Sequence, residues 1–89
     1  MSKLYNEAIS VTTDRARKDV REFIWRGRRY KVRSIVKCWR VRHTWWADDG
    51  GVNRWYYRVQ AARNGNSAGT YDLYFDGNKR HWCLERIWD

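Results

Sequence analysis

Hydrophobic and polar positions alternate with a period of two through much of the second half of the chain. In residues 55–61, Trp55, Tyr57 and Val59 alternate with more polar neighbours, and residues 70–75 and 82–85 repeat the pattern. Because successive side chains of a strand point to opposite faces of a sheet, this period predicts strands with one face toward a core. The residues predicted to face that core are Trp55, Tyr57, Val59, Ala61, Tyr71, Leu73, Phe75, Trp82 and Leu84.

Turns between the predicted strands must come from glycine, asparagine and aspartate, because the chain contains no proline. We expect turns at residues 26–28, 48–51, 64–69 and 76–78. The pair Asp76-Gly77 is the strongest hairpin signal, since it readily adopts the positive φ angles of a tight turn. The segments 23–25 and 30–32, on either side of Gly27, predict another hairpin.

The stretch of residues 29–42 is long for one flat strand, and its hydrophobic positions change parity on the way. Tyr30 and Val32 occupy even positions, whereas Trp39 occupies an odd one. A shift of one residue moves every later side chain to the other face, so we expect a bulge or sharp bend near residues 33–34. The expected fold class is mainly β: a bent antiparallel sheet or small barrel-like meander of five to six strands, with at most one short helix.

Two segments leave alternatives open. Residues 14–23 fit a short helix capped by Asp14, with Val20 and Phe23 at helical spacing, but a charged loop fits equally well. Within residues 1–19, an opening strand near residues 8–13 is a weak signal, and a loosely ordered N-terminal segment is the alternative. The 89 residues predict a single domain covering residues 1–89, with seven Trp, six Tyr and two Phe residues to build its core.

The chain shows no sign of export or membrane insertion. A third of its residues are charged, no apolar run is long enough to span a membrane, and residues 1–7 lack the apolar stretch of a signal peptide. We therefore expect a cytoplasmic protein in which Cys38 and Cys83 are reduced thiols. The oligomeric state is not predicted.

Positive charge is concentrated in one segment. Residues 15–42 contain twelve Lys and Arg against two acids, a balance of +10, while the rest of the chain has a balance of −1, which together give the net charge of +9. Such asymmetry attracts polyanions, although a solvated basic face that aids solubility is the alternative.

Several of these cations are predicted to share one face of the long strand. If Tyr30 faces the core, Arg29, Lys31 and Arg33 point outward together, and Arg40 and Arg42 join them if Trp39 and Val41 face the core after the bend. The hairpin tip adds Arg26 and Arg28, and arginine suits bidentate contact with phosphate. The alternative is that cations on an edge strand prevent edge-to-edge aggregation.

Aromatic residues beside arginine suggest a second element of the same surface. Tyr56, Arg58 and Tyr74 lie opposite the predicted core face, and if their strands pair they form an exposed patch on which bases of a single strand could stack. Cross-strand aromatic pairing, or a second small core, is the alternative. The nucleic-acid-binding candidates are therefore Arg26, Arg28, Arg29, Lys31, Arg33, Arg40, Arg42, Tyr56, Arg58 and Tyr74.

Signatures of enzymes and metal sites are missing. The chain has no phosphate-binding glycine loop, nucleophile elbow or zinc-protease helix, so we expect no catalytic residues and no cofactor. Cys38, His43, His81 and Cys83 could in principle hold zinc, but their spacing and faces do not suit a closed tetrahedral site, and we expect no bound metal.

The sequence also carries a resemblance to a known family. The run Phe-Ile-Trp-Arg-Gly-Arg-Arg-Tyr-Lys-Val at residues 23–32 resembles the opening of a small bacterial domain of unknown function, common in actinobacteria. The later aromatic motifs, from Trp39 to Trp88, are similar in order to those of the C-terminal domain of ImuB-type proteins, inactive relatives of Y-family polymerases. The resemblance implies a cytoplasmic accessory domain that works near DNA in repair or translesion synthesis and has no catalytic residues.

These observations lead to one functional expectation with one alternative. The chain is expected to be a non-enzymatic basic module that binds nucleic acid, with single strands favoured. It is not expected to bind a membrane. The alternative is a protein-interaction module that docks onto an acidic partner in a DNA-repair assembly.

Overall fold

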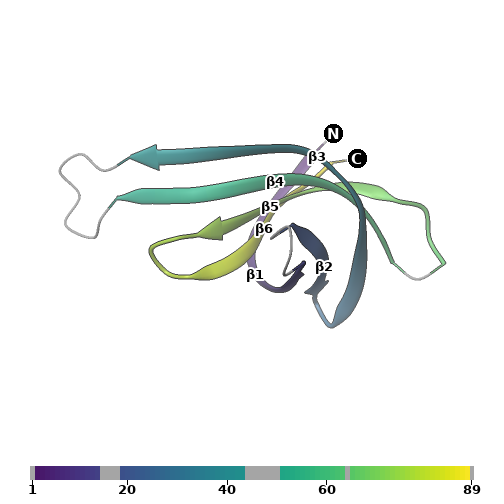
Figure 1. Cartoon of the computed structure of the whole chain (residues 1–89). Helices are drawn as coiled ribbons and strands as arrows, with labels where there is room; N and C mark the ends of the chain where they lie inside the picture. The colour runs from purple at the N-terminus through teal and green to yellow at the C-terminus, as the bar shows by residue number, and fades with distance from the viewer. Residues whose placement is uncertain (1, 15–18, 44–50, 64, 89) are drawn as a thin grey trace.

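The computed structural model describes residues 2–14, 19–43, 51–63 and 65–88, which form six strands (Figure 1). The strands are β1 (Ser2–Thr13), β2 (Val20–Trp25), β3 (Arg28–His43), β4 (Val52–Arg63), β5 (Gly69–Asp76) and β6 (His81–Trp88). Each strand pairs antiparallel with the next, and β6 returns to pair with β1, so the sheet closes into a ring. This arrangement confirms the predicted all-β class. The described part of the chain contains no helix with the length and apolar character needed to cross a membrane.

The structure differs from two expectations for residues 2–23, namely the length of the first strand and the possible short helix. β1 is longer than the strand expected near residues 8–13, because it pairs with both β2 and β6. Residues 20–23 belong to β2, where Val20 and Phe23 are buried in the core, so the helix is wrong for these residues. The Asp14 N–H donates a hydrogen bond to the Asp19 carbonyl, 2.8 Å away, and does not begin a helix. Residues 15–18 lie outside the described residues.

The hairpin expected around Gly27 is present between β2 and β3. Its two loop residues, Arg26 and Gly27, have φ angles of 52° and 75°, the positive values typical of a two-residue turn that matches the twist of its strands. An L-residue rarely adopts such a φ, but the Arg26 guanidinium forms an ion pair with Glu7 at 2.7 Å and lies over the Trp25 ring. These contacts fix the hairpin tip against β1.

β3 contains the predicted irregularity and a second one. Its pairing with β4 shifts between Val32 and Ser34, which confirms the bulge expected near residues 33–34, and it shifts again between Ile35 and Lys37. Each shift lets one extra residue into β3 and bends the strand, as its curved path in Figure 1 shows. β3 and β4 then run on side by side as an extended pair that projects beyond the other strands.

The main core fills the inside of the ring. Phe23, Val59, Leu73 and Leu84 are fully buried there, and a side chain of this size contributes about 1.5–3 kcal/mol on burial. The alternation predicted for β4, β5 and β6 is confirmed, since Val59, Leu73 and Leu84 lie on the expected face. The buried residues of this cluster are Val20, Phe23, Trp25, Tyr30, Val59, Ala61, Leu73 and Leu84.

A second, smaller cluster lies on the outer face of the same strands. It consists of Tyr56, Tyr74 and Cys83, with Trp39 and Val41 packed against them. The Trp39 and Tyr56 rings are stacked, with centroids 5.1 Å apart and planes 4° from parallel. This side of β3–β6 is therefore a packed aromatic layer rather than an open surface.

Two more of the expected turns have counterparts within the described residues. Residues 65–68 connect β4 to β5, and residues 77–80 connect β5 to β6, so the hairpin predicted at Asp76-Gly77 is present but its turn extends beyond residues 76–78. The positive φ angle expected at Asp76-Gly77 is found at Arg80 instead, where φ is 54°. The Asp76 carboxylate accepts hydrogen bonds from the backbone N–H groups of Asn78 and Lys79. Residues 48–50 of the fourth expected turn lie outside the described residues.

Candidate functional site

Four cations meet at the strongly curved end of β3. Arg29, Lys31 and Arg33 from β3 and Arg63 from the end of β4 line an open hollow of about 670 Å³. Its remaining described lining, Ala62 and Gly65, is uncharged. We call Arg29, Lys31, Arg33 and Arg63 the basic cluster.

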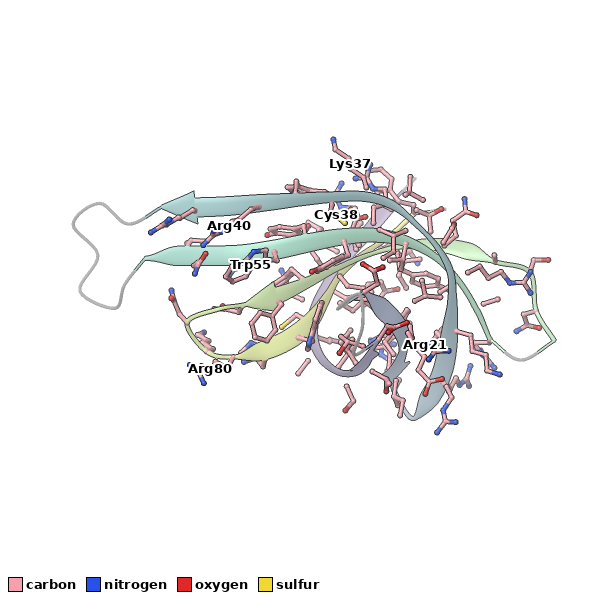
Figure 2. All side chains as sticks on the ribbon, in the orientation of Figure 1. Arg21, Lys37, Cys38, Arg40, Trp55 and Arg80 are labelled. Carbon is pink, nitrogen blue, oxygen red and sulfur yellow. The ribbon has the colours of Figure 1, made fainter. Side chains whose placement is uncertain are left out.

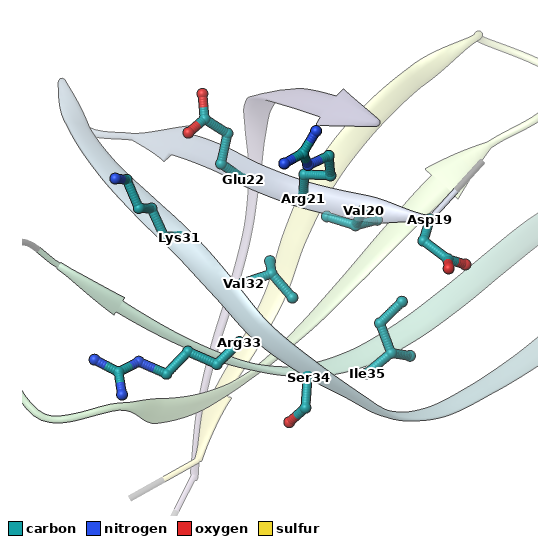
Figure 3. Close-up of a pocket in the computed structure, with 9 residues that line it drawn as sticks. All are labelled: Asp19, Val20, Arg21, Glu22, Lys31, Val32, Arg33, Ser34 and Ile35. Atoms are coloured by element: carbon teal, nitrogen blue, oxygen red, sulfur yellow. The ribbon is translucent and has the colours of Figure 1, made fainter. Parts of the chain in front are cut away.

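Strand geometry explains why these side chains converge. Arg29 and Lys31 are two residues apart and so share a face, while Arg33 is the extra residue of the first bulge. Figure 3 shows Lys31 and Arg33 extending from the same side of β3. Arg63 pairs with Tyr30, which lies between Arg29 and Lys31 in β3, and this places Arg63 at the edge of the same hollow.

The basic cluster is only weakly neutralised by the protein. The Arg29 Nε lies 3.8 Å from a Glu22 carboxylate oxygen, and the Arg29 side chain is 63% exposed. An exposed pair at this distance contributes about 0–1 kcal/mol, so a phosphate could compete for Arg29. No described acid forms an ion pair with Lys31, Arg33 or Arg63. The cluster therefore offers cations to an outside anion.

A neighbouring hollow differs in charge. β2 and β3 pair only as far as Glu22 and Lys31, and the strands then diverge around a space of about 680 Å³ (Figure 3). Asp19 and Glu22 line it together with Arg21, Lys31 and other residues. Because these two acids offset part of the positive charge of Arg21, Lys31 and Arg33, this hollow suits an anion less well than the basic cluster does.

Arg40 and Arg42 do not join the basic cluster, and the single stripe expected from the sequence is wrong. The second register shift, between Ile35 and Lys37, returns the strand to its original parity, so Trp39 shares the face of Lys31 while Arg40 and Arg42 share the opposite one. Arg40 also donates two hydrogen bonds to Asn53 and lies over the Trp55 ring, 4.4 Å from its centroid (Figure 2).

Tyr56 and Tyr74 are not exposed, which corrects the predicted stacking patch. They are 8% and 5% exposed, because Trp39 and Val41 pack against them in the outer cluster. The alternative of a second small core is the one that the structure shows. Burial raises the pKa of the Tyr56 hydroxyl, and a hydrogen bond from Arg54 opposes that shift only in part.

Arg58 is likewise committed to the fold. Its guanidinium donates hydrogen bonds of 2.8 and 3.2 Å to the two carboxylate oxygens of Asp72, which is buried. The hydrogen bond to Asp72 raises the pKa of Arg58, although burial opposes it. This bidentate pair leaves Arg58 little freedom to contact a ligand.

The two cations of the hairpin tip have different surroundings. Arg26 is held by Glu7, and the hydrogen bond from Arg26 is the main cause of the lowered pKa of the Glu7 carboxyl. Arg28 is exposed, and no described acid pairs with it. Arg28 is therefore the tip residue with a free charge.

The two thiols considered for zinc do not lie together. Cys38 pairs with Tyr57 on the inner face of the sheet, whereas Cys83 pairs with Tyr74 on the outer face, so the two thiols point to opposite sides. Both are free cysteines, and the described residues contain no group of three or more His, Cys, Asp or Glu that could hold a metal. The side chain of His43 lies outside the description.

Arg63 is the cluster member that the sequence did not indicate. It lies outside the basic segment of residues 15–42 and ends a strand of mostly apolar residues. Only the register that pairs Arg63 with Tyr30 places it next to Arg29 and Lys31, the neighbours of Tyr30 in β3. A register between two strands far apart in sequence depends on the whole fold, and the local pattern did not contain it.

The closed ring of six antiparallel strands and the cation-lined hollow define a small all-β domain with a basic surface cluster. The model of a family described as a domain of unknown function (DUF6504) matches residues 1–89, and the chain belongs to this family. No curated protein and no solved structure matches it. The resemblance to a domain of unknown function is thereby confirmed, whereas no match links the chain to ImuB-type proteins.

Proposed function

We propose that this domain binds nucleic acid through the basic cluster and performs no catalysis itself. The observation that carries the proposal is the convergence of Arg29, Lys31, Arg33 and Arg63 on one hollow whose described lining contains no acid. Phosphates spaced along a backbone can contact several such cations at once, and each contact releases counterions. Arg28 at the hairpin tip extends the same charge.

The surface supports a polyanion over an acidic protein as the partner. Protein interfaces usually centre on buried aromatic anchors surrounded by a polar rim. Among the described residues, the exposed large hydrophobic side chains are Leu4, Ile24 and Val36, which lie on three different strands, and no aromatic ring is among them. A docking patch of the expected kind is therefore lacking in that part of the chain.

The proposed cellular role and location of this binding rest on the sequence alone. A role in DNA repair or translesion synthesis, in the cytoplasm, is proposed from the resemblance to ImuB-type C-terminal domains. Neither follows from membership of the family.

Neutralising single cations tests the assignment of the site. Lys31→Ala and Arg63→Ala should each weaken binding to single-stranded oligonucleotides of any sequence and make the log–log salt dependence shallower by about 0.7. Arg42→Ala removes the same charge from the opposite face of β3 and should leave the slope unchanged. Fluorescence anisotropy at several salt concentrations gives these slopes. Equal effects of all three variants would show that net charge, rather than the basic cluster, drives binding.

A further inference from the structure

A third hollow opens directly beside the basic cluster, at one mouth of the ring. Its volume is about 380 Å³, and the rings of Tyr5, Trp25, Tyr30 and Tyr71 line it. These rings contact one another edge-on or tilted, for example Tyr5 with Trp25 at 5.0 Å and Tyr30 with Tyr71 at 5.4 Å between centroids. Arg63 lines this mouth pocket as well as the basic cluster.

Tyr30 contributes a phenol ring with a hydroxyl group to the lining of the mouth pocket. The residue is 5% exposed, and its ring stacks on Phe23 with centroids 4.9 Å apart. Tyr30 lines the pocket, and a phenol hydroxyl can both donate and accept a hydrogen bond. A ligand in the pocket could therefore form a hydrogen bond with Tyr30.

The remaining lining favours a ligand rich in hydrogen-bond acceptors. Lys3, Arg63, Asn66 and Ser67 contribute donors at the rim, and the lining that the structure describes contains no acid. Burial raises the pKa of the Tyr71 hydroxyl, so Tyr71 remains a neutral donor at physiological pH. Aromatic walls with a few converging polar groups are typical of sites for small planar ligands, and barrel mouths are common places for them.

We propose that the mouth pocket receives one base of a single-stranded nucleic acid while the basic cluster holds the adjacent phosphates. Arg63 lies at the junction of the two sites, where a sugar-phosphate would connect base to backbone. A base in a duplex is stacked and paired, so only a single strand or an extruded base can enter. This inference rests on the proposed function and specifies its substrate as single-stranded.

The base-pocket proposal is tested with two labelled single-stranded oligonucleotides of equal length, one of normal bases and one fully abasic. Both carry the same phosphates, so the ratio of their dissociation constants isolates the bases. Wild-type protein should bind the normal strand at least about fivefold more tightly, because stacking and hydrogen bonding of even one base contribute that much. A fully duplex oligonucleotide should lose the same advantage.

Two variants test whether the preference for the normal strand over the abasic strand arises in the mouth pocket. Tyr30→Phe keeps the buried ring and removes only the hydroxyl, and Ser67→Ala removes the hydroxyl of an exposed residue of the lining. Each should reduce the ratio by about two- to tenfold, the contribution of one neutral hydrogen bond. Tyr57→Phe, a partly buried tyrosine outside the pocket lining, is the matched control and should leave the ratio unchanged.

The possible failures are distinguishable. Equal binding of the normal and abasic strands would overturn the base pocket and leave the phosphate-binding function standing. A preference for normal bases that survives both Tyr30→Phe and Ser67→Ala would place the base site elsewhere and overturn the assignment to this pocket. Absence of binding to either strand at low salt would overturn the proposed function itself.

Discussion

Asp72 shows how a single buried charge organises the outer face. It is 2% exposed, and its carboxylate accepts hydrogen bonds from Arg58 and from the Trp88 indole at 2.9 Å. The Arg58 guanidinium in turn lies over the rings of Trp39 and Trp88. The carboxylate thus ties three strands together, and the arginine that the sequence suggested for ligand binding serves the fold instead.

Replacing Asp72 should therefore destabilise the protein strongly. Asp72→Ala leaves the Arg58 charge and the Trp88 N–H without their partner, and we expect a loss of about 2–4 kcal/mol in the free energy of unfolding, measured in urea. Glu22→Ala, which removes an acid from the exposed pair with Arg29, should cost less than about 1 kcal/mol. Similar losses in both variants would argue against a special role of Asp72.

At the scale of elements, alternation was readable from the sequence and long-range register was not. The core faces of β4, β5 and β6 follow directly from the period of two, and the parity change located the first bulge of β3. The second bulge, between Ile35 and Lys37, left no such mark, because Trp39 and Val41 are also packed against aromatic residues, on the outer face. One period-two pattern cannot distinguish two apolar layers on opposite sides of a sheet.

The candidate site was likewise predicted where it depends on the local pattern and missed where it depends on long-range register. Arg29, Lys31 and Arg33 were predicted together, because they lie within one short stretch of strand around the bulge that the sequence revealed. Arg40 and Arg42 were misplaced by the unseen second shift, and Arg63 needed the register of β4 against β3. Tyr56 and Tyr74 were assigned to the correct face, but their burial depends on neighbours from other strands.

The turn between β5 and β6 gives a pH-dependent prediction. Burial opposes ionisation of Asp76, but hydrogen bonds from the Lys79 and Asn78 backbone N–H groups and the nearby charge of Arg54 together lower its pKa below the ordinary value of 3.8. A carboxyl with a lowered folded-state pKa stabilises the fold above the unfolded-state pKa, and that contribution is lost as the pH falls through the folded-state pKa.

Asp76→Asn should accordingly lose about 1 kcal/mol at neutral pH, because its amide oxygen accepts the same bonds without a charge. The difference in unfolding free energy between wild type and variant should stay constant from neutral pH down to about pH 5, then shrink below pH 4 as the carboxylate protonates. Urea titrations across this range measure it. A difference that does not change with pH would show that the ionised carboxylate does not hold the turn.

At the scale of the whole molecule, the closed sheet separates structural cations from available ones. Arg26, Arg54 and Arg58 are held by acids or aromatic rings, whereas the basic cluster presents its charges at one end of the ring. A net charge of +9 alone predicts loose attraction to any polyanion. The arrangement of that charge beside an aromatic mouth predicts a defined site with a countable number of phosphate contacts.

The number of phosphate contacts is the most direct test of nucleic-acid binding by the basic cluster. Wild-type protein is titrated into a labelled single-stranded oligonucleotide by fluorescence anisotropy over a series of salt concentrations, and the logarithm of the association constant is plotted against that of salt. Four contacts, one for each cation of the basic cluster, predict a linear plot with a slope of about −3. Absence of binding at about 50 mM salt, or an affinity that does not fall as salt rises, would contradict nucleic-acid binding by the basic cluster.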